Sequence, residues 1–99
     1  MAMVYDSQGH YAKALDYYEK ALSINVKAVG QEHPIVADTY YNMAIVYHNQ
    51  GDYAKSLDHY EKALSIRLEA VGQEHPSVAD TYNGMANVYE SQGDSAPDL

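Results

Sequence analysis

The fold follows from one stretch of sequence that occurs twice. Residues 43–66 read MAIVYHNQGDYAKSLDHYEKALSI, and residues 1–24 read MAMVYDSQGHYAKALDYYEKALSI. A second stretch, AVGQEHPSVADTY at 70–82, repeats AVGQEHPIVADTY at 28–40. At an offset of 42 residues, 39 of the 57 comparable positions are identical. Self-similarity at a fixed period of this size is typical of repeat proteins, in which each unit stacks on the next.

Each period contains signals for two helices, which we call helix A and helix B, and none for a strand. Pro34 and Pro76 suit a first helical turn, and Gly51 and Gly93 suit the position just past a helix end. Asp52 is a good N-cap, and the apolar residues after it advance by threes and fours, as one buried face requires. The sequence therefore predicts a single domain, 1–99, of five helices, the first of them short. The predicted ranges are 1–9, 34–50 and 76–92 for helix A, 10–29 and 52–71 for helix B, and 93–99 for a tail.

Composition excludes several classes of function. Fourteen acidic residues against six basic ones give a net charge of −8, which repels nucleic acid and anionic membrane surfaces. The chain has no cysteine, and therefore no disulfide framework or thiolate metal site. We find no secretory signal and no apolar run of about 18 residues that would span a membrane. The expected location is the cytoplasm.

A set of residues centred on the second period carries a family resemblance. They are Asn42, Met43, Ala44, Tyr47, Gln50, Gly51, Asp52, Tyr53, Leu57, Tyr60, Ala63, Leu64, His75 and Pro76. The pattern resembles the tetratricopeptide repeat of the kinesin light chain type. The resemblance implies an all-α, antiparallel helix-pair solenoid, a right-handed superhelix of about two and a half 42-residue repeats. It also implies that the A helices line a concave groove that binds peptide segments, without catalysis.

The differences between the two full copies of helix A form a stripe. Five pairs differ at steps of 1, 3, 3 and 1, which places them on one helical face: Tyr41/Asn83, Asn42/Gly84, Ile45/Asn87, His48/Glu90 and Asn49/Ser91. Residues that hold helix against helix should repeat, whereas residues that face an extended ligand are free to differ. A solvated face that varies freely is the alternative. The predicted peptide-binding groove comprises Asp38, Tyr41, Asn42, Ile45, His48, Asn49, Asp80, Asn83, Asn87 and Glu90.

The charge of this face indicates the kind of peptide. It carries Asp38 and Asp80 and no basic residue, so a carboxylate of the ligand would lack a positive partner. In the resembling repeats an Asn hydrogen-bonds the peptide backbone; Asn42 keeps this residue, and Gly84 loses it. We therefore expect a protein or peptide ligand that is basic or polar rather than acidic.

No chemistry-bearing motif accompanies the repeat. His33 and His75 stand one period apart in identical turns, where repetition indicates a scaffold role and not a metal site. Phosphate-binding loops, nucleophile elbows and cysteine nucleophiles are absent from the sequence. We expect no enzyme activity, no cofactor and no metal.

The ends of the chain predict self-association. The sequence MANVYESQGD at 85–94 nearly copies MAMVYDSQGH at 1–10, so the last helix A of one molecule would take the place of the short first helix in another. The predicted contact residues are Met1, Met3, Val4, Tyr5, Tyr82, Met85, Val88 and Tyr89. A homo-oligomer is expected, and a self-assembling module with no peptide ligand is the rival function. If the chain is a piece of a longer array, the open ends are artefacts of the cut.

Overall fold

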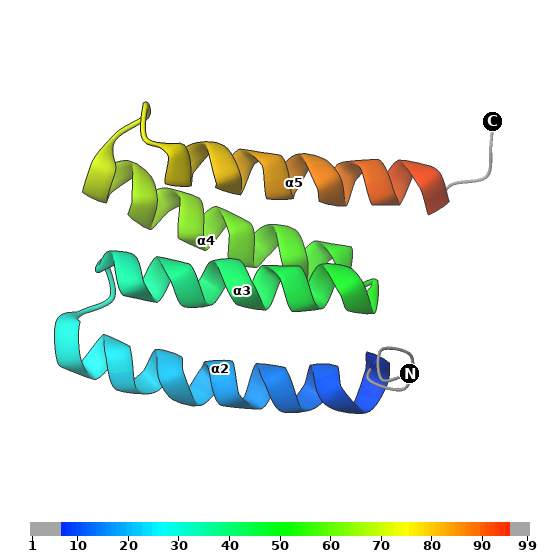
Figure 1. Ribbon diagram of the computed structural model, residues 1–99, viewed down its shortest axis with the longest axis horizontal. Helices are drawn as coiled ribbons and strands as arrows, with labels where there is room; N and C mark the ends of the chain where they lie inside the picture. The colour runs from blue at the N-terminus through cyan, green and yellow to red at the C-terminus, as the bar shows by residue number, and fades with distance from the viewer. Residues whose placement is uncertain (1–6, 96–99) are drawn as a thin grey trace.

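Four helices stack side by side. The computed structural model describes the backbone of residues 7–95 and the side chains of residues 10–93. Within that part the chain forms no strand, and its helices are α2 (Ser7–Val29), α3 (Pro34–Gln50), α4 (Tyr53–Val71) and α5 (Pro76–Ser95). Consecutive helices run antiparallel, and α2 and α5 lie at opposite edges of the molecule (Figure 1). Helix α3 is central, because it contacts α2, α4 and α5.

A repeated histidine begins each A helix. The His33 side chain is the N-cap of α3, where its Nδ1 accepts a hydrogen bond of 3.1 Å from the Ile35 N–H. One period later, His75 Nδ1 accepts a bond of 3.0 Å from the Ser77 N–H. The proline that follows each histidine has no N–H to leave unsatisfied in the first turn. The His-Pro pair is therefore a helix-start signal, which gives the two histidines the scaffold role expected of them.

Gly51 ends α3 and turns the chain into α4. Its φ of 88° is left-handed, a conformation that glycine adopts at no steric cost. Its N–H donates to the His48 carbonyl at 3.0 Å, and the Asp52 N–H donates to the Tyr47 carbonyl at 2.9 Å. Asp52 then accepts from the Lys55 N–H at 3.4 Å as the N-cap of α4. The turn thus leaves few backbone groups unpaired between α3 and α4.

Two helix ends differ from the prediction. Helix α2 begins at Ser7 instead of residue 10. The reason is that His10 stands where the later copy has the capping Asp52, so no capping residue starts a new helix at this point. Helix α5 continues through Gly93 to Ser95 instead of ending at residue 92. Glycine permits a left-handed turn without requiring one, and Ser95 and Pro97 replace the Tyr53 and Lys55 that follow the turn at Gly51.

The predicted count of five helices is not matched, since the described residues form four. Residues 7–9 of the short first helix belong to the first turn of α2, and its residues 1–6 lie outside the described part.

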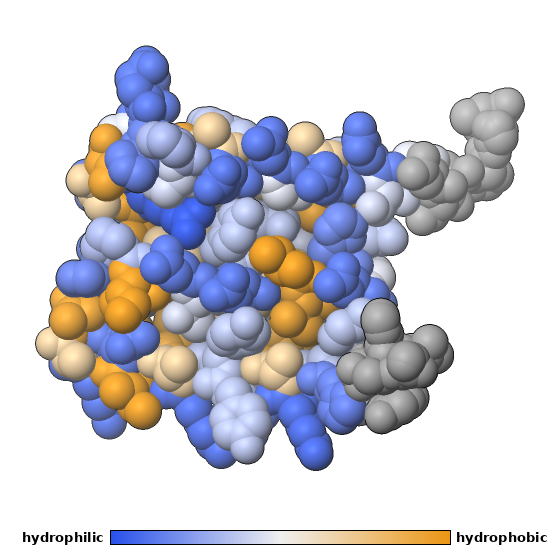
Figure 2. Space-filling view, in the orientation of Figure 1, coloured by the Kyte–Doolittle hydropathy of each residue, from blue (hydrophilic) through white to orange (hydrophobic). Residues whose placement is uncertain are grey.

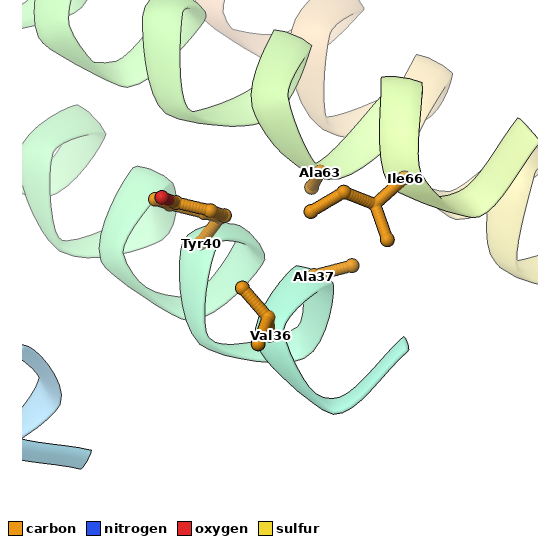
Figure 3. Close-up of a cluster of buried hydrophobic side chains, with 5 residues drawn as sticks. All are labelled: Val36, Ala37, Tyr40, Ala63 and Ile66. Atoms are coloured by element: carbon orange, nitrogen blue, oxygen red, sulfur yellow. The ribbon is translucent and has the colours of Figure 1, made fainter. Parts of the chain in front are cut away.

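The core consists of two clusters that share Tyr41. In the first, Val36, Ala37 and Tyr40 of α3 pack against Ala63 and Ile66 of α4 (Figure 3). Leu22 and Val26 of α2 also pack against this cluster. In the second, Ala44 of α3, Tyr60 of α4 and Val88 of α5 come together. Each large apolar side chain buried in this way stabilises the fold by about 1.5–3 kcal/mol. The clusters therefore tie α2 and α5 to the central pair.

The outside of the molecule is mostly polar. Figure 2 shows hydrophilic side chains over most of one face, with the hydrophobic ones in separate patches. Across the described residues, every helix is too short or too polar to cross a bilayer.

Candidate functional site

One exposed side of α5 carries four polar residues in a row. They are Asp80, Asn83, Asn87 and Glu90, and their spacing of 3, 4 and 3 places them on one helical face. Each amide offers two donors and an acceptor, a combination that matches a peptide backbone. Neither carboxylate has an ion-pair partner among the described residues. The row can therefore offer hydrogen bonds and negative charge to a ligand.

A second row lies on α3, beside α5. It consists of Asp38, Asn42, Ile45 and Asn49, of which Asn42 is half-buried and the other three are exposed. Ile45 is 36% exposed and is the one large apolar side chain of the row. Because α3 and α5 touch, the two rows lie on neighbouring A helices. We call these eight residues the A-helix face.

Arg67 of α4 extends to this face and links three helices, α3, α4 and α5. Its Nη2 donates to Asp38 Oδ1 of α3 at 2.9 Å, and its Nη1 donates to Thr81 Oγ1 of α5 at 2.9 Å. The same Nη1 donates to the Ser77 carbonyl at 3.1 Å. The guanidinium lies 4.7 Å from the centre of the Tyr41 ring, and Arg67 is 8% exposed. A buried cation with this many partners binds the repeats together.

The prediction that this face has no basic residue is therefore wrong, because a residue of helix B supplies one. The sequence contains the signal that was missed. Arg67 stands where the first copy has Asn25, so comparing the copies of helix B as well as helix A would have singled it out.

Two residues of the predicted groove serve packing between helices. His48 Nε2 and Ser91 Oγ share a hydrogen bond of 2.8 Å that links α3 to α5, and the His48 ring contacts Tyr53 edge-on. Tyr41 is half-buried and packs edge-to-face against Tyr60, with ring centroids 5.5 Å apart. The assumption that inter-helix residues repeat between copies is thus wrong for both, because each forms contacts specific to one junction.

Gly84 differs from Asn42 for a packing reason. A Cβ on Gly84 would lie 2.5 Å from Cζ of Tyr60, so the absence of a side chain lets the tyrosine ring fit beneath α5. Tyr60 is 2% exposed. Burial, with a smaller contribution from Tyr41, raises the pKa of the Tyr60 hydroxyl above its ordinary value of 10.0.

The comparisons with known proteins agree with this architecture. Two family models, both described as "Tetratricopeptide repeat", match residues 35–97 and residues 1–35. The chain belongs to the tetratricopeptide repeat family. No curated protein matches it. Repeats of this family generally mediate protein–protein interaction and typically have no catalytic role.

The residues predicted for self-association lie in different environments in this tetratricopeptide repeat chain. Tyr82 and Tyr89 are 53% and 58% exposed on α5. Met85 is half-buried against Tyr60 and Ala44, so only part of it is accessible. Val88 is fully buried in the same cluster, so it presents no surface to another molecule while α5 is packed in this way. Met1, Met3, Val4 and Tyr5 lie outside the described residues.

A shallow pocket of about 240 Å³ lies away from the A-helix face of the tetratricopeptide repeat chain. It is lined by Gln31, Glu32, Tyr40, Lys62, Ser65 and Ile66, none of which is a predicted groove residue. In the part of the chain that the structure describes, no group of three or more His, Asp or Glu side chains is placed to hold a metal ion.

Proposed function

We propose that the chain is a non-enzymatic protein-interaction module whose A-helix face binds an extended peptide. The observation that carries the proposal is the exposed row Asp80, Asn83, Asn87 and Glu90, in which amides lie between unpaired carboxylates. Amides at helical spacing can each hydrogen-bond a peptide group of an extended chain. The family supports an interaction role in general terms.

The charge favours a basic or polar peptide over an acidic one. Asp80 and Glu90 add two negative charges to the A-helix face, and neither has an ion-pair partner among the described residues. Arg67, the cation beside Asp38, is 8% exposed and bonded to that carboxylate. An acidic ligand would have to displace Asp38 from Arg67 and would still meet the net charge of −8.

Fluorescence anisotropy with two sets of labelled extended peptides tests this proposal. The sets share length and polar content and differ in carrying lysines or glutamates. We expect the lysine set to bind more tightly, and Asp80→Asn and Asn87→Ala each to weaken binding about tenfold, the effect of losing one charged or polar contact. Asp58→Asn, the same change at an exposed site on α4, is the matched control. Equal binding of both sets, or no effect of either variant, would contradict the proposal.

Asn42→Ala is the suitable variant on α3, and Tyr41→Ala is not. Tyr41 packs on Tyr60 and under the Arg67 guanidinium, so removing its ring would weaken the fold and confuse any loss of binding. Asn42 is half-buried and takes no part in the core clusters.

Within the family we propose the kinesin light chain type. The support is the period of 42 residues, which separates Pro34 from Pro76 and Gly30 from Gly72. An ordinary tetratricopeptide repeat is shorter, at about 34 residues.

A self-assembling structural module is the second candidate function. It is favoured by Tyr82 and Tyr89, two large rings that lie more than half exposed on one side of α5. Tyrosine is enriched at protein interfaces, because its ring is apolar and its hydroxyl can still hydrogen-bond. Light scattering after size-exclusion chromatography, over a hundredfold range of concentration, tests it: a constant 11.0 kDa species contradicts self-assembly.

A further inference from the structure

The interface between α3 and α4 is formed by two rows of residues, and each row occurs a second time on another helix of the chain. We use this interface as a template. Its α3 row is Ala37, Tyr40, Ala44 and Tyr47, and its α4 row is Ser56, His59, Ala63 and Ile66. The rings of Tyr40 and Tyr47 lie on either side of His59, with centroid distances of 5.9 and 5.0 Å. Ser56 Oγ donates to the Ala44 carbonyl at 2.7 Å, so the two helices approach closely at small residues.

Two lysines complete this interface. The Lys62 ammonium lies 5.5 Å from the centre of the Tyr40 ring. The Lys55 ammonium lies 5.6 Å from that of Tyr47. Ile66, 5% exposed, packs with Ala37 and Tyr40 at one end of the interface (Figure 3). Each helix thus contributes a fixed set of residues at fixed spacing.

The α3 half of the template recurs uncovered on α5. Ala79, Tyr82, Ala86 and Tyr89 are identical to the α3 row one period earlier, and we call them the α5 row. Tyr40 is 9% exposed under α4, whereas Tyr82 is 53% exposed. The α5 row differs in that no helix of the described chain covers it.

The α4 half recurs on α2, where its two large side chains are exposed. Its members, which we call the α2 row, are Ala14, Tyr17, Ala21 and Ile24, and the lysines beside them are Lys13 and Lys20. Tyr17 and Ile24 are 69% and 66% exposed, although the corresponding His59 and Ile66 are largely covered. The α2 and α5 rows lie on helices at opposite edges of the molecule, so they cannot meet within one chain (Figure 1).

We propose that a second copy of this chain binds head to tail, its α2 row on the α5 row, in the register of the α3–α4 interface. The inference rests on the second candidate function and adds to it the surfaces, the direction and the register. Tyr17 of the second copy lies between Tyr82 and Tyr89, as His59 lies between Tyr40 and Tyr47. Lys20 and Lys13 of the second copy stand over Tyr82 and Tyr89 as Lys62 and Lys55 stand over their tyrosines.

Charge supports this direction over a symmetric pairing. Helix α2 has three lysines against two acidic residues, a net charge of +1, and α5 has three acidic residues and no basic one, a net charge of −3. Pairing α5 with α5 would bring the two most negative helices together, whereas pairing α5 with α2 joins opposite charges. Because the two surfaces differ, the contact is heterologous and continues into a ring or a filament.

Single cysteines introduced into this cysteine-free chain test the register. The template pair Ala44 and Ser56 corresponds to Ala86 and Ala14. An Ala14→Cys chain is mixed with an isotope-labelled Ala86→Cys chain under mild oxidation, and disulfide-linked dimers are identified by mass. We expect the mixed dimer to exceed both homotypic dimers at least fivefold. Ala12→Cys replaces Ala14→Cys as the matched control, because its counterpart Ala54 stays exposed beside the α3–α4 interface.

The outcomes distinguish this inference from the broader candidate. A constant 11.0 kDa mass overturns both self-assembly and the proposed register. Association with mostly homotypic disulfides, or with equal yields from the Ala12 and Ala14 variants, overturns the register alone. As a second measurement, Tyr89→Ala and Ile24→Ala should each weaken association at least tenfold while leaving the helical circular dichroism unchanged. Val71→Ala, at an exposed apolar residue outside both rows, should leave association unchanged.

Discussion

At the scale of single residues, Gly84 shows how one atom decides the packing of a helix. Its missing Cβ is what allows the buried Tyr60 ring to lie against α5. The ring has little freedom to move, because it also packs edge-to-face on Tyr41 and contacts Val88 and Ala44 in the second cluster. A larger residue at position 84 must therefore displace a ring that is held on several sides.

Gly84→Ala should destabilise the protein even though alanine favours helices. Overpacking typically costs about 1–3 kcal/mol, and replacing glycine in a helix returns about 1 kcal/mol, so we expect a net loss of about 1 kcal/mol. Gly93→Ala is the matched control in the same helix, because a Cβ there meets nothing within 4 Å. It should stabilise by a few tenths to about 1 kcal/mol. Urea denaturation measures both, and equal signs for the two variants would refute the packing argument.

Tyr60 also predicts how stability depends on pH. Its pKa is raised in the folded protein, so above pH 10.0 the unfolded chain loses the phenolic proton while the folded chain retains it. This contribution is fully present below pH 10.0 and is lost as pH rises through the folded pKa. Denaturation curves measured below and above pH 10.0 should show that the free energy of unfolding falls as the pH rises. Tyr60→Phe should reduce the fall, and a variant that loses stability as steeply as the parent would exclude Tyr60 as its source.

At the scale of helices, the caps decide where each element begins. His33 and His75 accept a hydrogen bond from the N–H of the second residue of their helices. We expect His33→Ala to cost about 1 kcal/mol, the usual value of an N-cap, which lowers Tm by roughly 4–8 °C in a domain of this size. His33→Asn restores a side-chain acceptor and should recover most of the loss. An alanine variant that melts with the parent would show that the bond contributes nothing.

The helix ends also show what the sequence can and cannot predict. The predicted range 34–50 coincides with α3, because His33, Pro34 and Gly51 together specify both ends. The prediction failed at Gly9 and Gly93, where a glycine occurs without its partners: His10 replaces the capping aspartate, and Pro97 replaces a lysine. A single glycine is insufficient to predict a helix end, because helix termination also depends on the residues that pack and cap the next turn.

The predicted site was also only partly correct at the level of side chains. The predicted groove residues of α5 lie on one exposed face, as their spacing requires: Asp80, Asn83, Asn87 and Glu90. Tyr41 and His48 were assigned to the same face because they differ between copies, yet such differences also arise where one junction needs its own contact. Arg67 was missed because it belongs to helix B and reaches the face over the length of its side chain.

At the scale of the whole molecule, Arg67 couples the repeats, and removing its charged partner should weaken that coupling. Asp38→Ala leaves a guanidinium that is 8% exposed without its carboxylate, and we expect a loss of about 1–2 kcal/mol because the side chain of Asp38 is itself largely exposed. Asp80→Ala, one period later and without an ion pair, should change stability by less than about 0.5 kcal/mol. If guanidinium chloride denaturation showed the same loss of stability for Asp38→Ala and Asp80→Ala, the ion pair would not hold the repeats together.

The similarity of α3 and α5 allows a wrong pairing during folding, because either helix carries the Ala-Tyr-Ala-Tyr row that fits α4. If α5 docked first where α3 belongs, α3 would have to take the place of α5 beside Tyr60. There the side chain of Asn42 would collide with the ring for which Gly84 leaves room. The glycine therefore favours the order of helices seen in the structure, because it distinguishes α5 from α3 at the position where either helix would meet Tyr60.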